Sequence, residues 1–202
     1  YTMDKTVSVT GHSLYEYQVV IDIPAALRKR IETDRQQITE NYGIVQPPAG
    51  RPHISLVRFM AVKKMENKIT LQLQQVAMAA KPFTVVLRDY DGYPMHAVFI
   101  QIDNQQKVLD LIKNLKSARR LMKAGGDEPH FLLDPQMVLA GRLENDTYIR
   151  IMKEYQHKKF AADFVADAFL LLRRNDDEKR YELVKRFEFA FVPEKKPQGV
   201  LF

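Results

Sequence analysis

Apolar and polar positions alternate along several short stretches of the chain and recur with a helical period along others. Strict alternation is typical of strands, and the longer period is typical of amphipathic helices. Runs rich in β-branched residues between turn-forming residues strengthen the strand predictions. The expected strands are residues 17–23, 50–59, 82–90, 96–102, 134–143, 168–174 and 181–192. The expected helices are residues 24–43, 63–80, 104–123 and 144–164.

Residues that favour helix ends and turns separate these elements. Pro24 suits the first position of a helix, and Gly43 suits its C-terminal stop. Asn104 is a suitable N-cap for the helix that follows it. Residues 91–94, DGYP, have strong turn chemistry, and residues 175–177 indicate the turn of a closing hairpin.

The elements follow one another without a long linker, in the order β-α-β-α-β-β-α-β-α-β-β. This order predicts an α+β fold built from a duplicated unit. Two antiparallel-containing sheets are expected to face each other across a central groove, with helices outside. We expect one two-lobed domain over residues 1–202, with an N-terminal extension at residues 1–14 and a C-terminal tail at residues 193–202.

A histidine and a serine stand two positions apart in the strand-like stretch GRPHISLVRF. His53, Ser55 and Val57 are expected on one face of this strand, because alternate residues of a strand share a face. The hydroxyl can donate to a phosphate oxygen, and the imidazole can exchange a proton near neutral pH. On its own, the same pattern also fits an ordinary half-exposed strand. Cleaving a phosphodiester needs a second, facing group on the other side of phosphorus.

The stretch PHISLVRF, residues 52–59, resembles the first signature of the 2H phosphoesterase superfamily, which contains 2′–5′ RNA ligases and cyclic phosphodiesterases. That family carries two His-x-Ser/Thr motifs, each usually preceded by proline and followed by aliphatic residues. Its fold is a duplicated two-lobed α+β arrangement, with one motif of each lobe facing a central groove. The resemblance extends over roughly residues 15–192.

The segment DPQMVLAGRL, residues 134–143, is the best match for the second motif. It begins with a proline, alternates aliphatic residues and carries Arg142 near its end. Gln136 stands where the family has its second histidine, and Val138 stands where it has Ser or Thr. Glutamine has no proton to give at neutral pH, and valine cannot bind a phosphate oxygen. The second half of the catalytic pair is therefore altered.

We expect two sets of site residues, the second of which includes the arginines that close the two motif strands. His53 and Ser55 are the expected catalytic residues, with His53 as the base. Gln136, Arg58 and Arg142 are expected to bind substrate or phosphate.

His130, six residues before Gln136, also follows a proline. It could reach the groove as a displaced acid, or it could be an ordinary loop histidine. Asp127 and Glu128 lie beside it, but without further ligands at suitable spacing we expect no metal site and no cofactor.

Composition narrows the function classes further. The chain has no cysteine, which excludes disulfides, thiolate metal sites and cysteine nucleophiles and fits a reducing, cytoplasmic compartment. Its net charge of +6 fits anionic partners such as nucleotides or RNA, and it equally fits an ordinary basic solvated surface. We find neither a membrane-spanning run nor a signal peptide, and no P-loop, GxSxG or GxGxxG motif.

Two functions remain open at this point. The first is an enzyme that opens 2′,3′-cyclic phosphates or acts as a 2′–5′ RNA ligase, with reduced or altered catalysis. The second is a non-catalytic module derived from such an enzyme, which keeps nucleotide or RNA binding. In both cases the expected partner is a nucleotide or RNA with a cyclic phosphate or a 2′–5′ linkage, and we expect a monomer.

Overall fold

The computed structural model describes residues 13–48, 50–123, 126–175 and 180–190. The strands are β1 (Leu14–Asp22), β2 (His53–Val62), β3 (Phe83–Tyr93), β4 (Ala97–Ile102), β5 (His130–Phe131), β6 (Met137–Gly141), β7 (Ala161–Ala166), β8 (Ala168–Arg174) and β9 (Glu182–Glu188). The helices are α1 (Ala25–Tyr42), α2 (Glu66–Ala79), α3 (Gln105–Leu115) and α4 (Asn145–Tyr155), with 3₁₀ turns at Lys63–Met65 and Lys116–Leu121. The expected N-terminal extension and C-terminal tail fall almost wholly on residues 1–12 and 191–202, outside the described residues.

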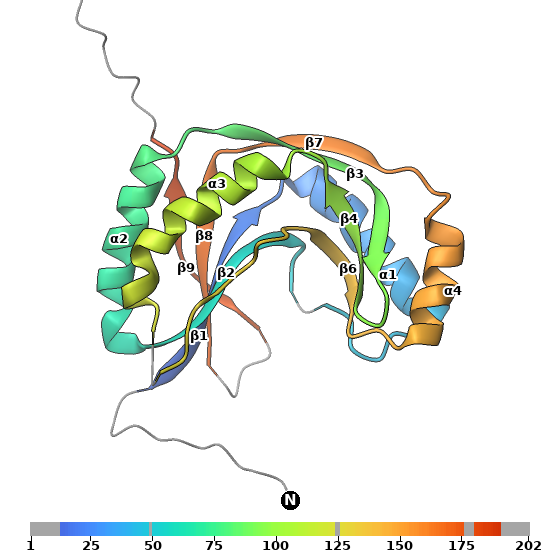
Figure 1. Cartoon of the computed structure of the whole chain (residues 1–202), viewed down its shortest axis with the longest axis horizontal. Helices are drawn as coiled ribbons and strands as arrows, with labels where there is room; N and C mark the ends of the chain where they lie inside the picture. The colour runs from blue at the N-terminus through green and yellow to red at the C-terminus, as the bar shows by residue number, and fades with distance from the viewer. Residues whose placement is uncertain (1–12, 49, 124–125, 176–179, 191–202) are drawn as a thin grey trace, which may run out of the picture.

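Two antiparallel sheets form an arch (Figure 1). One sheet has the strand order β5-β2-β1-β8-β9, and the other has the order β6-β4-β3-β7. In Figure 1, β1, β2, β8 and β9 lie on one side of the arch and β4 and β6 on the other, while β3 and β7 cross its top. This arrangement confirms the predicted α+β class, with two sheets and helices outside.

The two lobes exchange segments of the chain. Helix α1 follows β1 in sequence but packs against β6 and α4. Helix α3 follows β4 in sequence but lies beside α2 and β2 (Figure 1). The C-terminal strands β8 and β9 complete the sheet that begins with β1 and β2. Each lobe is therefore built from both halves of the sequence.

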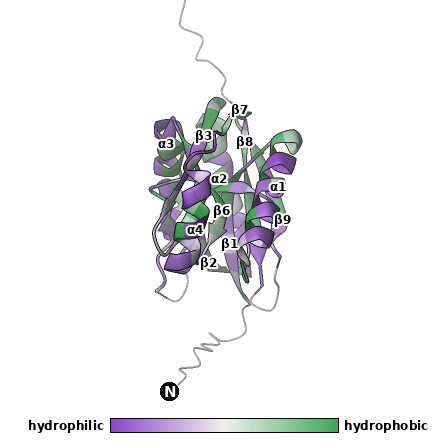
Figure 2. Cartoon of the chain, turned by 90° about the vertical axis from the view of Figure 1, so that its right-hand side faces the viewer, coloured by the Kyte–Doolittle hydropathy of each residue, from purple (hydrophilic) through white to green (hydrophobic). Residues whose placement is uncertain are grey.

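Amphipathic patterning explains how the helices cover the sheets. In Figure 2 hydrophobic residues gather along the central strands, whereas the helices carry hydrophilic residues on part of their surface. On α1, Ile31 and Ile38 are fully buried. Gly43 ends this helix with a left-handed φ of 66°, as its position predicts.

The prediction of a helix over residues 144–164 is wrong in its second half. Helix α4 ends at Tyr155, and residues 161–166 form β7, which pairs antiparallel with β3. In β7, Phe164 and Ala166 are buried while Val165 between them is exposed, which is the period-two pattern of a strand. No glycine or proline separates the two elements, so the sequence gives no break signal between them.

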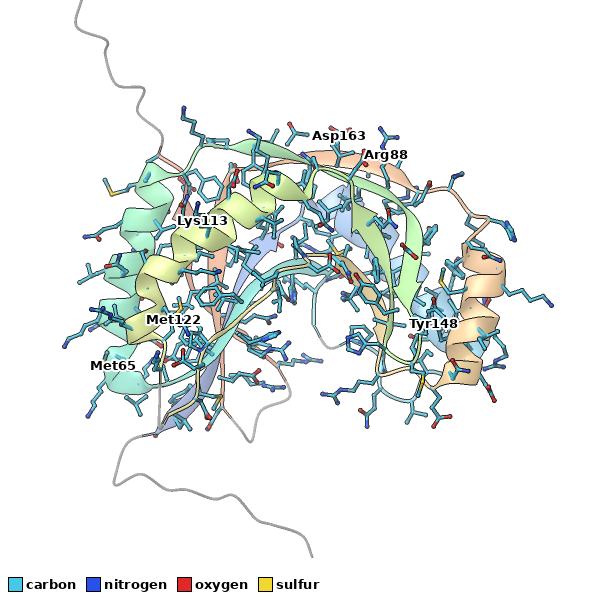
Figure 3. The ribbon with its side chains drawn as sticks, in the orientation of Figure 1. Met65, Arg88, Lys113, Met122, Tyr148 and Asp163 are labelled. Carbon is cyan, nitrogen blue, oxygen red and sulfur yellow. The ribbon has the colours of Figure 1, made fainter. Side chains whose placement is uncertain are left out.

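The turn expected at residues 91–94 lies further along the chain. Strand β3 includes Gly92, and the turn is formed by the residues after the strand, where Met95 has a φ of 58°. A Cβ on Gly92 would lie 2.7 Å from Ala97 O and 2.7 Å from Tyr148 Cε2. Figure 3 shows Tyr148 between α4 and the β3–β4 hairpin. The glycine therefore allows close packing inside a strand rather than a turn.

Asn104 precedes α3 as predicted, but its side chain does not cap the helix. Its Oδ1 accepts a hydrogen bond from Val86 N at 2.9 Å, and its Nδ2 donates to Thr84 O at 2.7 Å. The side chain thus ties the start of α3 to β3.

Candidate active site

The two motif strands begin next to each other at the top of the arch and run apart into opposite lobes (Figure 1). Arg35 of α1 joins them. Its Nε and Nη2 donate to Val138 O on β6, at 3.0 and 2.7 Å, and its Nη1 donates to Gly50 O just before β2, at 3.3 Å. Burial lowers the pKa of Arg35 to about 10, so the guanidinium remains charged at neutral pH.

The sequence interpretation missed Arg35, although its spacing carries a signal. It lies four residues after Ile31 and three before Ile38, the two fully buried residues of α1. Residues with this spacing share a helix face, so an arginine between two core isoleucines points inward.

His53 begins β2 and is held by a main-chain acceptor. Its Nδ1 lies 2.8 Å from Arg51 O, so Nδ1 carries the proton and Nε2 is left with a free lone pair. Burial lowers the pKa of His53, as do the nearby Arg35 and Arg58, while the Arg51 carbonyl acts in the opposite direction. At neutral pH the ring is thus uncharged, which is the state that a general base requires.

Ser55 lies on the same face as His53, and its hydroxyl has a fixed partner. Gln18 on β1 donates from its Nε2 to Ser55 Oγ at 2.7 Å. The Gln18 residue is only 2% exposed. Because the oxygen accepts this bond, the hydroxyl proton can be donated to a phosphate oxygen. Gln18 was also missed by the sequence interpretation, although it is the one polar residue within the apolar run Tyr17–Ile21.

The expectation that Val57 shares this face is wrong. The register between β1 and β2 shifts by one residue, so that Val20 is opposite Ser55 while Val19 is opposite Val57. Beyond this bulge, Val57 is fully buried and Arg58 is exposed.

A cavity of about 700 Å³ adjoins His53 on its own sheet. Its apolar lining consists of Val20, Leu170, Leu172 and Leu183. Its charged and aromatic lining consists of Asp22, Glu32, Arg51, Arg180, Tyr181 and Arg186. A hollow with an apolar floor and several arginines suits a ligand that combines a ring system with phosphate groups.

Gln136, just before β6, takes part in a hydrogen-bond network. Its Nε2 donates to Tyr93 Oη at 3.0 Å and to Asp134 Oδ2 at 2.7 Å. The Tyr93 hydroxyl itself donates to Asp134 Oδ2, and Gln105 Nε2 donates to Asp134 Oδ1 at 3.1 Å. The pKa of Tyr93 is raised, first by its bond to Asp134 and then by burial.

The structure does not bring His130 next to His53. His130 lies on β5, directly opposite Arg58 of β2, so the two side chains share a face. Arg58 is five residues beyond His53, which corresponds to about 15 Å along a strand. This separation is too long for both histidines to act on one phosphorus atom. Arg58 itself pairs with Glu16, with Nε and Oε1 3.3 Å apart.

Arg142 also lies away from the start of its motif strand. It follows the far end of β6, where its Nη1 donates to Gln46 Oε1 at 3.1 Å. It lines a separate cavity of about 350 Å³ between the loop after α1 and the start of α4. Arg58 thus lies midway along β2 and Arg142 just after β6, while His53 and Gln136 lie at the beginnings that meet.

The part of the chain that the structure describes contains no group of three or more His, Asp and Glu side chains placed to hold a metal ion. Within the same residues, no helix is both long and apolar enough to cross a membrane.

Comparisons with known proteins agree with this geometry. The family model described as the 2′-5′ RNA ligase superfamily matches residues 23–178. No curated protein sequence matches the chain.

Solved structures provide the comparison of folds. The structure of E. coli LigT complexed with 3′-AMP matches with a TM-score of 0.69 at 17% identity, covering 89% of this chain and 100% of that chain. E. coli LigT complexed with ATP gives a TM-score of 0.62 at 17% identity, with 89% and 99% covered. TT0787 of Thermus thermophilus gives 0.61 at 16% identity, with 87% and 98% covered. The fold and the family model together show that this chain belongs to the 2′-5′ RNA ligase superfamily, within the 2H phosphoesterases.

Proposed function

We propose that the chain opens 2′,3′-cyclic phosphates at the end of a nucleotide or an RNA, by hydrolysis when water attacks and by 2′–5′ ligation when a 5′-hydroxyl attacks. In this proposal His53 Nε2 takes the proton of the attacking water or hydroxyl, and Ser55 Oγ donates to a non-bridging oxygen. Arg35 supplies a fixed positive charge near both motif strands. Gln136 orients the Tyr93 hydroxyl at the facing motif through the bond from its Nε2.

One observation carries this proposal. His53 and Ser55 share a face, and each has a partner that leaves the needed atom free: Arg51 O at 2.8 Å for the imidazole and Gln18 Nε2 at 2.7 Å for the hydroxyl. Two functional groups fixed in this way are typical of a preorganised site rather than of an ordinary strand surface.

The cavity beside His53 supports a nucleoside attached to this phosphate. Its apolar floor can cover a base or ribose, and Arg51, Arg180 and Arg186 can attract further phosphate groups. The E. coli LigT structures with 3′-AMP and ATP show that a relative binds nucleotides.

A hydrolysis assay with 2′,3′-cyclic nucleotides and a 2′–5′-linked dinucleotide tests the proposal. We expect turnover by the wild-type chain and none above background for His53→Ala. The double variant Gln136→His/Val138→Thr restores the family motif and should turn over faster, by up to about 10²–10⁴-fold, the usual contribution of general acid–base catalysis. His157→Ala, which changes a histidine beyond the end of α4, is the matched control and should behave as wild type.

The second candidate function is nucleotide or RNA binding without turnover. Gln136 and Val138 favour it, because neither side chain can protonate a leaving oxygen or bind it as a Ser/Thr would. Binding of 3′-AMP by a wild-type chain that shows no hydrolysis, together with turnover that appears only in the restored variant, would establish this function and refute the first one.

A further inference from the structure

We infer that Tyr93 is the proton donor of this site: its hydroxyl stands at the second motif in place of the imidazole that the chain lacks there. This inference rests on the proposed hydrolysis of a cyclic phosphate and names the residue that completes it.

The position of the hydroxyl is fixed from several sides. It donates to Asp134 Oδ2 and accepts from Gln136 Nε2 at 3.0 Å. Asp134 is held in turn by Gln105 Nε2 at 3.1 Å. The ring of Tyr93 packs on Phe99, with ring centroids 5.1 Å apart. Every partner of the phenol therefore belongs to the sheet that carries the second motif or to the segments that flank it.

The ring of Tyr93 lies on the face of this sheet away from α4, because Gly92 before it packs on Tyr148 of α4 and neighbouring strand residues point to opposite faces. Gln136 directly precedes β6, and Val138, two positions later, accepts from Arg35 at 2.7 Å. The same guanidinium reaches Gly50 O, three residues before His53. Tyr93 is 44% exposed, so a ligand in the groove can reach it.

The electrostatic surroundings keep the Tyr93 hydroxyl protonated. Asp134 faces the phenol from the loop before β6, and Asp91 acts on it from β3; both raise the pKa of Tyr93. The phenol thus stays protonated through the neutral range, when His53 is uncharged. The hydrogen bond from Gln136 lowers the pKa of Tyr93, because an N–H donor stabilises the phenolate that forms on proton transfer.

The step balances with one water molecule. The water oxygen attacks phosphorus while His53 Nε2 takes one of its protons. The bond between phosphorus and the O3′ atom breaks, and the Tyr93 hydroxyl releases Asp134 Oδ2 and gives its proton to O3′. Solvent then carries the proton from the His53 imidazolium to the phenolate, which leaves a 2′-phosphate and both residues in their starting states.

Tyr93→Phe tests this inference, because it keeps the ring on Phe99 and removes only the hydroxyl. We expect kcat for a 2′,3′-cyclic nucleotide to fall by about 10²-fold or more, while the Kd for 3′-AMP stays close to the wild-type value. Tyr42→Phe is the matched control: Tyr42 also donates to a carboxylate, Glu154, at 2.5 Å, but between α1 and α4 outside the groove. It should leave kcat unchanged.

A pH profile separates proton donation from a structural role. Replacing Tyr93 with 3-fluorotyrosine lowers the pKa of the phenol, so the alkaline limb of kcat should move to lower pH while the acidic limb stays in place. A merely structural tyrosine would leave both limbs where they are.

Each result decides between the two claims. Unchanged kcat in Tyr93→Phe, with turnover still abolished in His53→Ala, overturns the role of Tyr93 and leaves the proposed function standing. If Tyr93→Phe loses both 3′-AMP binding and turnover, the role of Tyr93 as proton donor is also overturned. That result would show that the hydroxyl maintains the structure of the site and does not act in the proton transfer. A wild-type chain without turnover overturns both claims.

Discussion

At the scale of single residues, main-chain and amide groups set the chemistry of the first motif. The Arg51 carbonyl selects the tautomer of His53, and the amide of Gln18 orients the hydroxyl of Ser55. A His-x-Ser pattern fixes the residue types, but which imidazole nitrogen is basic depends on a carbonyl two residues away.

The lowered pKa of His53 leads to a prediction about pH. His53 must be uncharged to act as base, so the acidic limb of kcat/KM should have its midpoint below the ordinary histidine value of 6.5. A rate profile on a 2′,3′-cyclic nucleotide measures this midpoint. A midpoint at or above 6.5 would contradict the burial of the ring beside Arg35 and Arg58.

The same shift affects stability, with a sign that can be stated. The folded-state pKa of His53 lies below the unfolded value of 6.5, so the unfolded chain binds more protons as the pH falls through that value. The contribution is complete above pH 6.5 and is lost below it. Urea midpoints at neutral and acidic pH should therefore differ less for His53→Gln than for wild type.

At the scale of elements, the β3–β4 hairpin carries Tyr93 and depends on close packing at Gly92. We expect Gly92→Ala to lower the free energy of unfolding by about 1–3 kcal/mol, because the new methyl group overpacks the hairpin. It would lie 2.7 Å from Ala97 O and from Tyr148 Cε2.

Urea denaturation measures this effect, and Gly141→Ala is its matched control. Gly141 is also a strand glycine, on β6, and a Cβ there would meet nothing within 4 Å. Equal losses in the two variants would show that the loss comes from strand glycines in general and not from the contact with α4.

Most elements follow from local patterns, and the errors arise where distant contacts decide. The alternation around His53 and the Pro24–Gly43 helix signals are local, and both elements were predicted. Strand β7 exists because β3 provides an edge to pair with, and no residue between Tyr155 and Ala161 indicates the break. The turn after β3 is likewise displaced where α4, a helix far away in the sequence, packs closely on Gly92.

The site divides in the same way. His53, Ser55 and Gln136 were identified from a short motif and its altered copy. The partners Gln18, Arg35 and Tyr93 come from other strands and a helix, so only the fold shows that they belong to the site.

At the scale of the whole molecule, a single half-buried arginine, Arg35, joins the two lobes where their motif strands meet. We expect Arg35→Met to lower the free energy of unfolding by about 2–3 kcal/mol, since it removes charged hydrogen bonds to Gly50 O and Val138 O. It should also lower turnover, because it frees β2 and β6 to shift relative to each other.

Arg30→Met provides the control on the same helix. Arg30 Nη1 also donates to a carbonyl, Ala161 O, at 3.1 Å, but this bond is exposed. Its loss should cost less than about 1 kcal/mol in urea denaturation and leave turnover intact. Similar effects of the two substitutions would argue against a special role of Arg35.

The choice of acceptor on β6 has a consequence for sequence drift within such folds. Arg35 binds the carbonyl of residue 138, and every amino acid offers that carbonyl. The side chains at positions 136 and 138 can therefore diverge without releasing the guanidinium or opening the junction between the strands.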